Sequence, residues 1–136
     1  MATVTAKYLG NLRVECVHAA TGTTLISDAP VDNCGKGESF SPTDLCVTAL
    51  ASCAVTIIGI YGQRHDVDVT GMTAEVTKTM SSNPRRIGKI EVTFFMPDRD
   101  YTDKQKAMME RAAHSCPVHF SLHPEVEQIF TFKWAK

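Results

Sequence analysis

The first third of the chain consists of short runs rich in β-branched residues, separated by turn residues. These runs occupy residues 2–8, 11–18 and 23–27, with Leu9-Gly10-Asn11 and Thr21-Gly22 between them. Glycine-containing turns at this spacing are typical of β-hairpins, so the pattern predicts three short strands. Residues 28–40 then combine two glycines, a proline and several acids, which predicts a long loop.

A long helix is predicted to follow. Ser41 is a favourable N-cap, Pro42 suits the first helical position, and Asp44 brings a negative charge to the exposed amides of the first turn. The helix is expected to run to about Gly62. Its side chains are apolar on nearly every face, apart from a polar stripe at Asp44, Thr48, Ser52 and Thr56. A helix with this pattern is predicted to be buried at the centre of the molecule.

After this helix the period of the pattern changes. Alternating apolar residues predict strands over residues 67–80 and 89–96, joined by a hairpin loop. Residues 126–134 alternate in the same way and predict a last strand. Strands, a long helix, strands, a second helix and a strand in this order predict an α+β fold, with the helices packed on an antiparallel sheet.

The second helix begins at a capping box formed by Thr102 and Gln105. The helical spacing is kept by Tyr101, Gln105, Met108, Ala112 and Ser115. The helix is expected to stop at Cys116-Pro117, because the residue before a proline is disfavoured in the helical conformation. A short helical turn over residues 118–123 is expected to end at Pro124.

Length and charge narrow the class of protein. A chain of 136 residues fits one domain spanning residues 1–136. Fourteen Lys and Arg against fifteen Asp and Glu leave a net charge of -1, which provides no basic surface for nucleic acid. The N-terminus lacks the pattern of a targeting signal, and the longest apolar run, residues 45–61, is short for a membrane span. We expect a cytoplasmic protein without nucleic-acid or membrane partners.

The five cysteines are the most informative residues. In a reducing compartment a static disulfide framework is not expected. Cys16, on the apolar face of a strand, and Cys46, in the first turns of the long helix, are predicted as small core residues. Cys34 lies in the acidic loop and is predicted as an exposed surface thiol without a role.

Cys53 and Cys116 have two interpretations each. Cys53 lies about three turns into the long helix, beside its polar stripe, and Cys116 lies directly before Pro117. Both could be buried hydrophobic residues or reactive thiols. Cys116 is either the last residue of one helix, where the helix dipole opposes a thiolate, or the N-cap of the next, where it favours one.

A metal site is a further alternative. Cys116, His119 and His123 form a C-x2-H-x3-H pattern, and cysteine and histidine are the ligands that zinc prefers. A second closely spaced cysteine pair is absent from the sequence, and Pro124 cuts the helical turn short. We therefore expect no bound metal.

Three motifs together resemble the OsmC/Ohr family of osmotically inducible and organic hydroperoxide resistance proteins. They are Ser41-Pro42-Thr43-Asp44-Leu45, Ala49-Leu50-Ala51-Ser52-Cys53 and Ala113-His114-Ser115-Cys116-Pro117-Val118-His119. The resemblance covers nearly the whole chain. It implies an OsmC-like α+β fold in which antiparallel six-stranded sheets wrap around long central helices in an intertwined homodimer.

The resemblance also implies a function. Carried onto this sequence, Cys53 is the peroxidatic thiol that attacks an organic hydroperoxide, and Cys116 resolves the resulting sulfenic acid as a disulfide. The reductant would be an external dithiol, with no bound cofactor. The peroxidase branches carry a glutamate ten residues before the first cysteine, where this chain has Thr43. Glu38 is the candidate substitute, and Arg13 is the candidate arginine that activates Cys53.

A function of another class is also compatible with these residues. An apolar pocket around Cys53 could instead belong to a non-enzymatic module that binds a small apolar or thiol-bearing ligand. Such a module would bind its ligand without Cys53 and would show no turnover with any dithiol.

Overall fold

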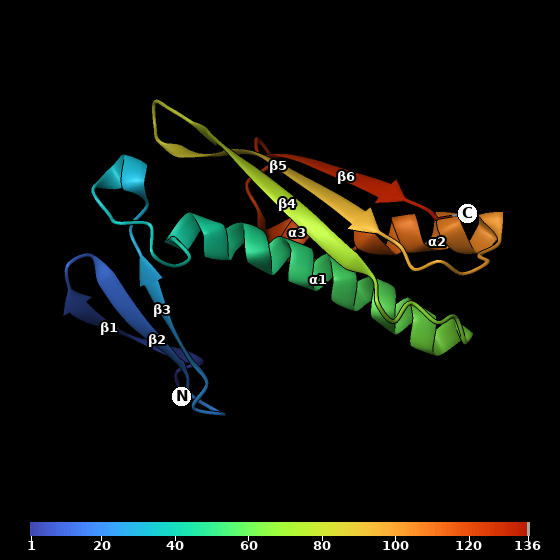
Figure 1. The fold of residues 1–136 in the computed structure, drawn as a ribbon, viewed down its shortest axis with the longest axis horizontal. Coiled ribbons are helices and arrows are strands. Elements are labelled where there is room, and N and C mark those ends of the chain that lie inside the picture. Colours follow the sequence, from blue (N-terminus) through green and yellow to red (C-terminus); the bar gives the residue numbers. More distant parts are fainter. Residues whose placement is uncertain (136) are drawn as a thin grey trace. The chain divides into compact units, whose positions relative to one another are not determined.

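The computed structural model describes residues 1–135. The chain forms two compact units, Met1–Cys46 and Val47–Lys136, and Figure 1 traces their elements. Each unit is compact by itself, so the assignment of residues 1–136 to one domain stays a prediction.

The first unit contains a three-stranded antiparallel sheet. β1 (Val4–Gly10), β2 (Arg13–His18) and β3 (Thr24–Asp28) lie in the order β1-β2-β3, which confirms the predicted hairpins. Gly10 and Gly22 in the turns have positive φ angles of 88° and 75°, a region that glycine adopts without strain. The predicted loop follows, with a short 3-10 helix, η1 (Val31–Asn33), inside it.

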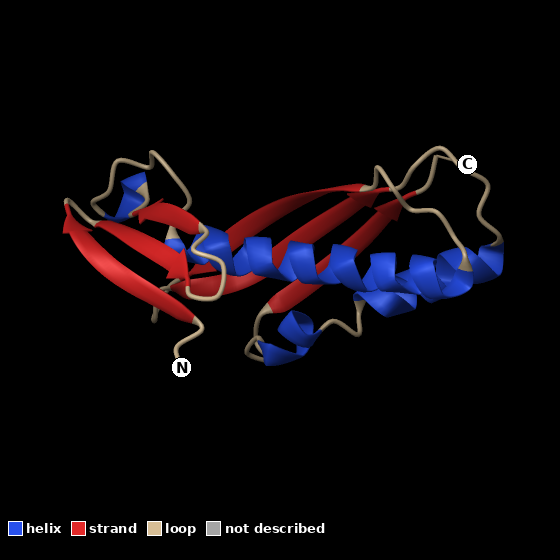
Figure 2. Ribbon diagram, turned by 90° about the horizontal axis from the view of Figure 1, so that it is seen from below, coloured by secondary structure: helices blue, strands red, loops and turns tan. Residues whose placement is uncertain are grey.

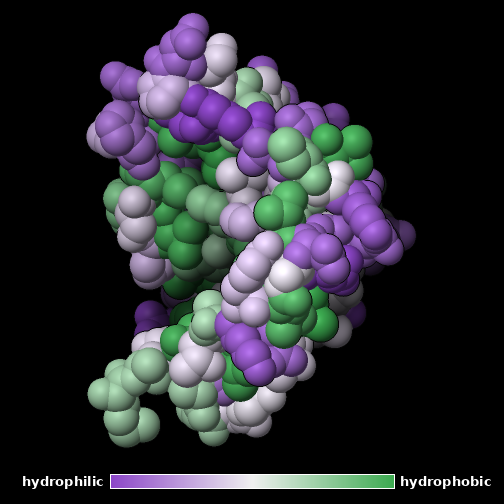
Figure 3. All heavy atoms as spheres, turned by 90° about the vertical axis from the view of Figure 1, so that its left-hand side faces the viewer, coloured by the Kyte–Doolittle hydropathy of each residue, from purple (hydrophilic) through white to green (hydrophobic). Residues whose placement is uncertain are grey.

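The buried side chains of the first unit are polar. Ser27, Asp28 and Ser41 are at most 5% exposed, whereas the buried hydrophobic side chains of the described residues all come from position 47 onward. On the sheet, Tyr8 is 64% exposed and Leu25 is 42% exposed. Figure 3 shows hydrophobic side chains at the surface among hydrophilic ones on the face that it views. The described part of this unit therefore has no hydrophobic core of its own.

Helix α1 (Pro42–His65) begins where the sequence predicts. The Ser41 hydroxyl oxygen accepts the N–H of Asp44 at 3.1 Å, and an Asp44 carboxylate oxygen accepts the N–H of Ser41 at 3.0 Å. This reciprocal cap satisfies amides that have no partner within a helix. The helix ends at His65, slightly beyond the predicted end at Gly62.

One side of α1 is buried and the other is open. Its buried residues are Val47, Leu50, Ala51, Ala54, Ile58 and Gly62. Ala49 and Ile60 are exposed, although the helix is apolar on nearly every face. A helix buried all round is thus not found within a single chain. By length and composition α1 could also cross a membrane, but core helices of globular proteins pass the same test.

The second unit contains a mixed sheet rather than the predicted antiparallel one. β4 (Thr73–Ser81) pairs antiparallel with β5 (Arg86–Phe95), but β6 (Glu127–Lys133) pairs parallel with β5. A parallel neighbour requires a long crossover connection. Helices α2 (Asp103–Ala113) and α3 (Pro117–Ser121) lie in this connection. The antiparallel prediction is wrong for β6, because alternation of side chains carries no information about strand direction.

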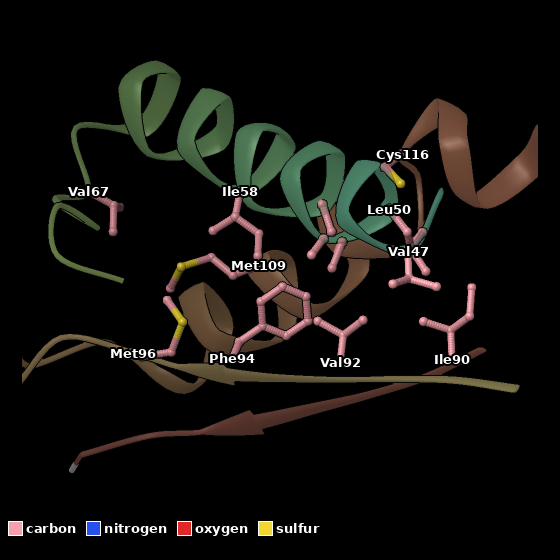
Figure 4. Close-up of a cluster of buried hydrophobic side chains, with 13 residues drawn as sticks. Val47, Leu50, Ile58, Val67, Ile90, Val92, Phe94, Met96, Met109 and Cys116 are labelled. Atoms are coloured by element: carbon pink, nitrogen blue, oxygen red, sulfur yellow. The ribbon is translucent and has the colours of Figure 1, made fainter. Parts of the chain in front are cut away.

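The core of the second unit lies between its helices and this sheet. Ile90, Val92 and Phe94 of β5 are at most 1% exposed and share one face, as their alternation predicts. Figures 2 and 4 show the helices on this side of the strands. The Phe94 ring stacks on Phe132 of β6 with centroids 4.5 Å apart. Burying each large apolar side chain contributes about 1.5–3 kcal/mol to folding.

Helix α2 has the predicted start, and its buried residues are not those that defined its helical spacing in the sequence. Thr102 and Gln105 exchange both hydrogen bonds of a capping box, at 3.1 Å and 2.9 Å. The buried residues are Met109 and Ala113, one position beyond Met108 and Ala112. One position rotates a side chain by about 100°. Contact with the core, which the helical spacing alone does not reveal, selects the buried face.

Candidate active site

Cys53 lies about three turns into α1 and is half-buried. Its side chain packs against the hydrophobic core of the second unit. In the polar stripe beside it, the Thr56 hydroxyl donates a hydrogen bond to the Ser52 carbonyl at 2.7 Å. Cys53 is thus a partly accessible thiol on an apolar background.

Cys116 is the N-cap of α3, which decides between the two positions left open by the sequence. It has an extended conformation (φ -73°, ψ 142°), and Pro117 follows as the first helical residue. Its sulfur accepts the N–H of His119 at 3.3 Å. The side chain is completely buried. Helix α2 ends three residues earlier, at Ala113, so the C-terminal end of α2 does not contain this thiol.

The two thiols are neighbours in the fold, although 116 - 53 = 63 positions separate them in the sequence. Burial raises the pKa of the Cys116 thiol, and the His119 N–H lowers it. The adjacent Cys53 raises the pKa further, through a side-chain hydrogen bond and through its charge. Figure 4 shows Cys116 against α1 near Leu50. Cys116 therefore holds its proton at neutral pH and offers an S–H donor beside Cys53.

Gln128 of β6 holds His119 in place, the residue whose N–H donates a hydrogen bond to the Cys116 sulfur. Its side-chain nitrogen donates to the His119 carbonyl at 3.1 Å, and its side-chain oxygen lies 2.6 Å from His119 Nδ1. Because that amide oxygen can only accept, His119 carries its proton on Nδ1. Sequence reasoning missed Gln128, since no motif or spacing connects it with the thiols.

The histidines of the C-x2-H-x3-H pattern have other partners. His119 Nδ1 is used by Gln128, and His123 Nδ1 accepts the N–H of Glu125 at 3.0 Å. Within residues 1–135, no group of three or more His, Cys, Asp and Glu side chains has an arrangement that could hold a metal ion.

Arg13 and Glu38 both lie in the first unit, where Asp28 connects them. Arg13 forms an ion pair with Asp28 at 3.4 Å, and the backbone N–H of Glu38 donates to the same carboxylate oxygen at 3.0 Å. Asp28 is buried, whereas the Arg13 side chain is 32% exposed. The roles of Arg13 and Glu38 in activating Cys53 stay predictions. Asp28 was not singled out from the sequence, and only its register opposite Arg13 across β2 and β3 reveals it.

The remaining cysteines follow the predictions in part. Cys34 is exposed, as expected for a loop residue. Cys16 and Cys46 are half-buried rather than fully buried core residues. Both belong to the first unit, whose described residues form no hydrophobic core into which a small side chain could be packed.

The model of the OsmC-like protein family matches residues 35–129. No curated protein matches the chain. A solved structure from Psychrobacter arcticus, described as a candidate osmotic stress induced and detoxification response protein, is 42% identical. That alignment covers 98% of this chain and 96% of the other, with a TM-score of 0.93.

Two more distant structures share the fold. An organic hydroperoxide resistance protein OsmC from Legionella pneumophila is 14% identical over 98% of each chain, with a TM-score of 0.76. A candidate organic hydroperoxide resistance protein from Vibrio cholerae, solved with captopril in one of its active sites, is 13% identical, with a TM-score of 0.74. It aligns over 97% of this chain and 92% of its own. The chain belongs to the OsmC-like protein family.

Proposed function

We propose that this protein is a thiol-dependent peroxidase that reduces organic hydroperoxides. The observation that carries the proposal is the contact between Cys53 and Cys116, two thiols distant in the sequence and adjacent in the second unit. The names of the Legionella pneumophila and Vibrio cholerae proteins, which refer to organic hydroperoxide resistance, support it further.

In the first step the Cys53 thiolate attacks the terminal oxygen of the hydroperoxide. The sulfur–oxygen bond forms as the O–O bond breaks, and the organic alkoxide leaves and takes up a proton as the alcohol. Cys53 is oxidised to a sulfenic acid. Cys116 lies next to the oxidised sulfur for the second step.

In the second step Cys116 loses its proton and attacks the Cys53 sulfur. A disulfide forms and water leaves. An external dithiol then reduces the disulfide by thiol–disulfide exchange and returns both cysteines to thiols, so the cycle requires no bound cofactor. Burial of Cys116 protects it from direct oxidation while its partner is reduced.

The activating pair of the proposal is Arg13 with Glu38. A guanidinium brought close to Cys53 would favour the thiolate by its positive charge. The ion pair of Arg13 with buried Asp28 supports this role in part, because a carboxylate already orients the guanidinium. Thr43 occupies the position where the peroxidase branches carry their glutamate. Asp28 is a carboxylate that could take the place of that glutamate.

The proposal includes a homodimer in the cytoplasm, with a hydroperoxide and a dithiol as its small-molecule partners and with neither nucleic acid nor membrane. Two observations support the dimer. The first unit leaves Tyr8 and Leu25 open, and α1 leaves Ile60 open. A second copy could cover these surfaces. The described residues of the first unit form no hydrophobic core, and such a unit gains stability mainly by association. Sedimentation as a monomer at micromolar concentration would contradict the dimer.

The experiment that tests the peroxidase is a thiol titration. Reduced protein is mixed with cumene hydroperoxide, and free thiols are counted before and after. We expect the loss of two thiols per chain in the natural protein and in the matched control Cys34→Ser, and no loss in Cys53→Ser. Undiminished loss of thiols in Cys53→Ser, or retention of all five thiols in the natural protein, would refute the proposal.

A second candidate function is a binding module for a small apolar or thiol-bearing ligand. The captopril bound to the Vibrio cholerae protein favours it, because captopril is a thiol-bearing compound. This candidate predicts that captopril raises the melting temperature of the natural protein and of Cys53→Ser equally. It also predicts no peroxide turnover with any dithiol.

A further inference from the structure

Helix α3, which contains the His119 that donates to the Cys116 sulfur, is tied to the sheet by the side chain of Gln128. The helix has only five residues, and helices this short are marginal by themselves. Val118 and Leu122 pack against the hydrophobic core, but apolar contacts have no preferred direction. Hydrogen bonds do have one, and Gln128 of β6 forms two of them with His119. Gln128 therefore orients α3, while the core contacts hold it nearby.

The two hydrogen bonds hold His119 on both sides of its Cα atom. The Gln128 side-chain nitrogen donates to the His119 carbonyl at 3.1 Å, and the side-chain oxygen accepts the Nδ1–H of the imidazole at 2.6 Å. In the sheet, Gln128 pairs with Ile90 of β5, whose side chain has no exposed surface. The amide is thus anchored on a well-packed part of the sheet, and it restrains both the backbone and the ring of His119.

This restraint matters for Cys116 because of what the second step of the proposed cycle requires. Cys116 is completely buried, and its thiol must lose its proton to attack Cys53. A buried thiolate needs hydrogen-bond donors in place of water. The His119 N–H lies 3.3 Å from the sulfur, and the backbone N–H groups of His119 and Val118 both lower the pKa of the Cys116 thiol. Both donors belong to α3, the helix that Gln128 orients.

We propose that Gln128 is a positioning residue for the resolving step, because it holds His119 so that the first N–H groups of α3 point at the Cys116 sulfur. This inference rests on the proposed peroxidase function and adds a residue to its second step. In that step the Cys116 sulfur bonds to the Cys53 sulfur as the S–O bond of the sulfenic acid breaks. The proton released by Cys116 leaves with the hydroxide as water. Gln128 acts on the negative charge of Cys116 through His119.

Titratable side chains approach Cys116 from three helices. Cys53 belongs to α1 and His119 to α3. His114 is the C-cap of α2, and its ring centroid lies 6.0 Å from that of His119. Gln128 reaches the same region from β6 and carries no charge. Its replacement by methionine, which has nearly the same length and no amide, therefore removes both hydrogen bonds without changing the charges around the sulfur.

The test separates the two steps after one addition of cumene hydroperoxide to reduced protein. Rapid quenching and mass spectrometry distinguish the Cys53 sulfenic acid from the disulfide by mass, at several pH values between 7 and 10. We expect Gln128→Met to form the sulfenic acid at the natural rate and the disulfide about twofold to fourfold more slowly at pH 7. The smaller thiolate fraction of Cys116 outweighs the greater nucleophilicity of a more basic thiolate. The deficit should shrink as the pH rises.

Two further variants sharpen this test. Gln128→Leu is a second apolar replacement and should behave like Gln128→Met. Thr131→Val is the matched control, because it replaces a polar side chain on the opposite, exposed face of β6 and should keep the natural rates and pH profile. Equal disulfide rates in the natural protein and in Gln128→Met would overturn the inference. So would a deficit that is the same at every pH, since that would mean a merely structural role. A natural protein that forms no disulfide would instead refute the proposed function.

A titration of Cys116 does not depend on turnover. In Cys53→Ser, the ultraviolet absorbance of thiolates is followed against pH, and the signal of the same protein with Cys116→Ala is subtracted. We expect the midpoint for Cys116 to lie about 0.5 to 1 higher on the pH scale when Gln128→Met is added. An unchanged or lower midpoint would contradict the role of Gln128, whatever the result with the hydroperoxide.

Discussion

The two units of the chain are stabilised in different ways. From Val47 onward, helices and a mixed sheet enclose side chains such as Leu50, Phe94 and Met109, which have no exposed surface. In Met1–Cys46 the buried side chains are polar, and large apolar ones such as Tyr8 are open. The unit with the hydrophobic core also contains the thiol pair. A rigid apolar background suits chemistry that depends on a fixed distance between two sulfurs.

The core of the second unit holds both thiols in position, so their arrangement does not require the first unit to have a hydrophobic core of its own. The first unit instead contains an ion pair of a buried carboxylate and a half-buried guanidinium, Asp28 with Arg13. Its open hydrophobic side chains are surfaces for association in the proposed dimer. The following substitutions test whether the units differ in this way.

The largest effect is expected from truncating the core of the second unit. Phe94→Ala should lower the free energy of unfolding by about 3–5 kcal/mol, because it leaves a cavity where the ring is completely buried. Phe95→Ala is the matched control, since this neighbour on the opposite face of β5 is 39% exposed and should cost less than about 1 kcal/mol. Urea unfolding measures both. Similar losses for the two variants would contradict the assigned core.

An intermediate effect is expected from the ion pair of the first unit. Arg13→Ala should cost about 1–3 kcal/mol, because it leaves the buried Asp28 carboxylate without its cation, although the 32% exposure of Arg13 softens the penalty. Asp28→Asn and the double variant complete a cycle that isolates the interaction. Strictly additive losses would mean that the pair does not stabilise the first unit.

The smallest effect is a pH dependence from Cys116. Its pKa is raised in the folded protein, so the unfolded chain releases this proton at lower pH than the folded one. The folded state keeps its full stability while the pH is below the ordinary pKa of a free thiol. It loses stability as the pH rises from that ordinary pKa through the raised pKa of Cys116. The natural protein should therefore lose stability relative to Cys116→Ala between pH 7 and pH 10 in urea unfolding. A difference that grows with pH would contradict the raised pKa.

Local signals in the sequence predicted the local structure well. The caps at Ser41 and Thr102 depend on neighbouring residues, and both form the expected hydrogen bonds. The alternation of Ile90, Val92 and Phe94 likewise identified the inner face of β5. These features could be predicted because the interacting groups lie within a few positions of one another.

Features that depend on distant segments could not be predicted in this way. The parallel direction of β6 follows from the path of the crossover, and the buried face of α2 is selected by the core. The partners Asp28 and Gln128 have no motif, since register and packing bring them to Arg13 and His119. The pairing of Cys53 with Cys116 came from the family resemblance, and the fold then brought the two thiols together.

The most direct test of the central claim is to map the disulfide formed by one equivalent of organic hydroperoxide. The reduced protein is oxidised, blocked with an alkylating agent and digested, and the linked peptides are identified by mass spectrometry. The account predicts a link between Cys53 and Cys116, with Cys16, Cys34 and Cys46 alkylated. A protein in which Cys53 and Cys116 are both alkylated after treatment, or in which the link joins another pair, would contradict it.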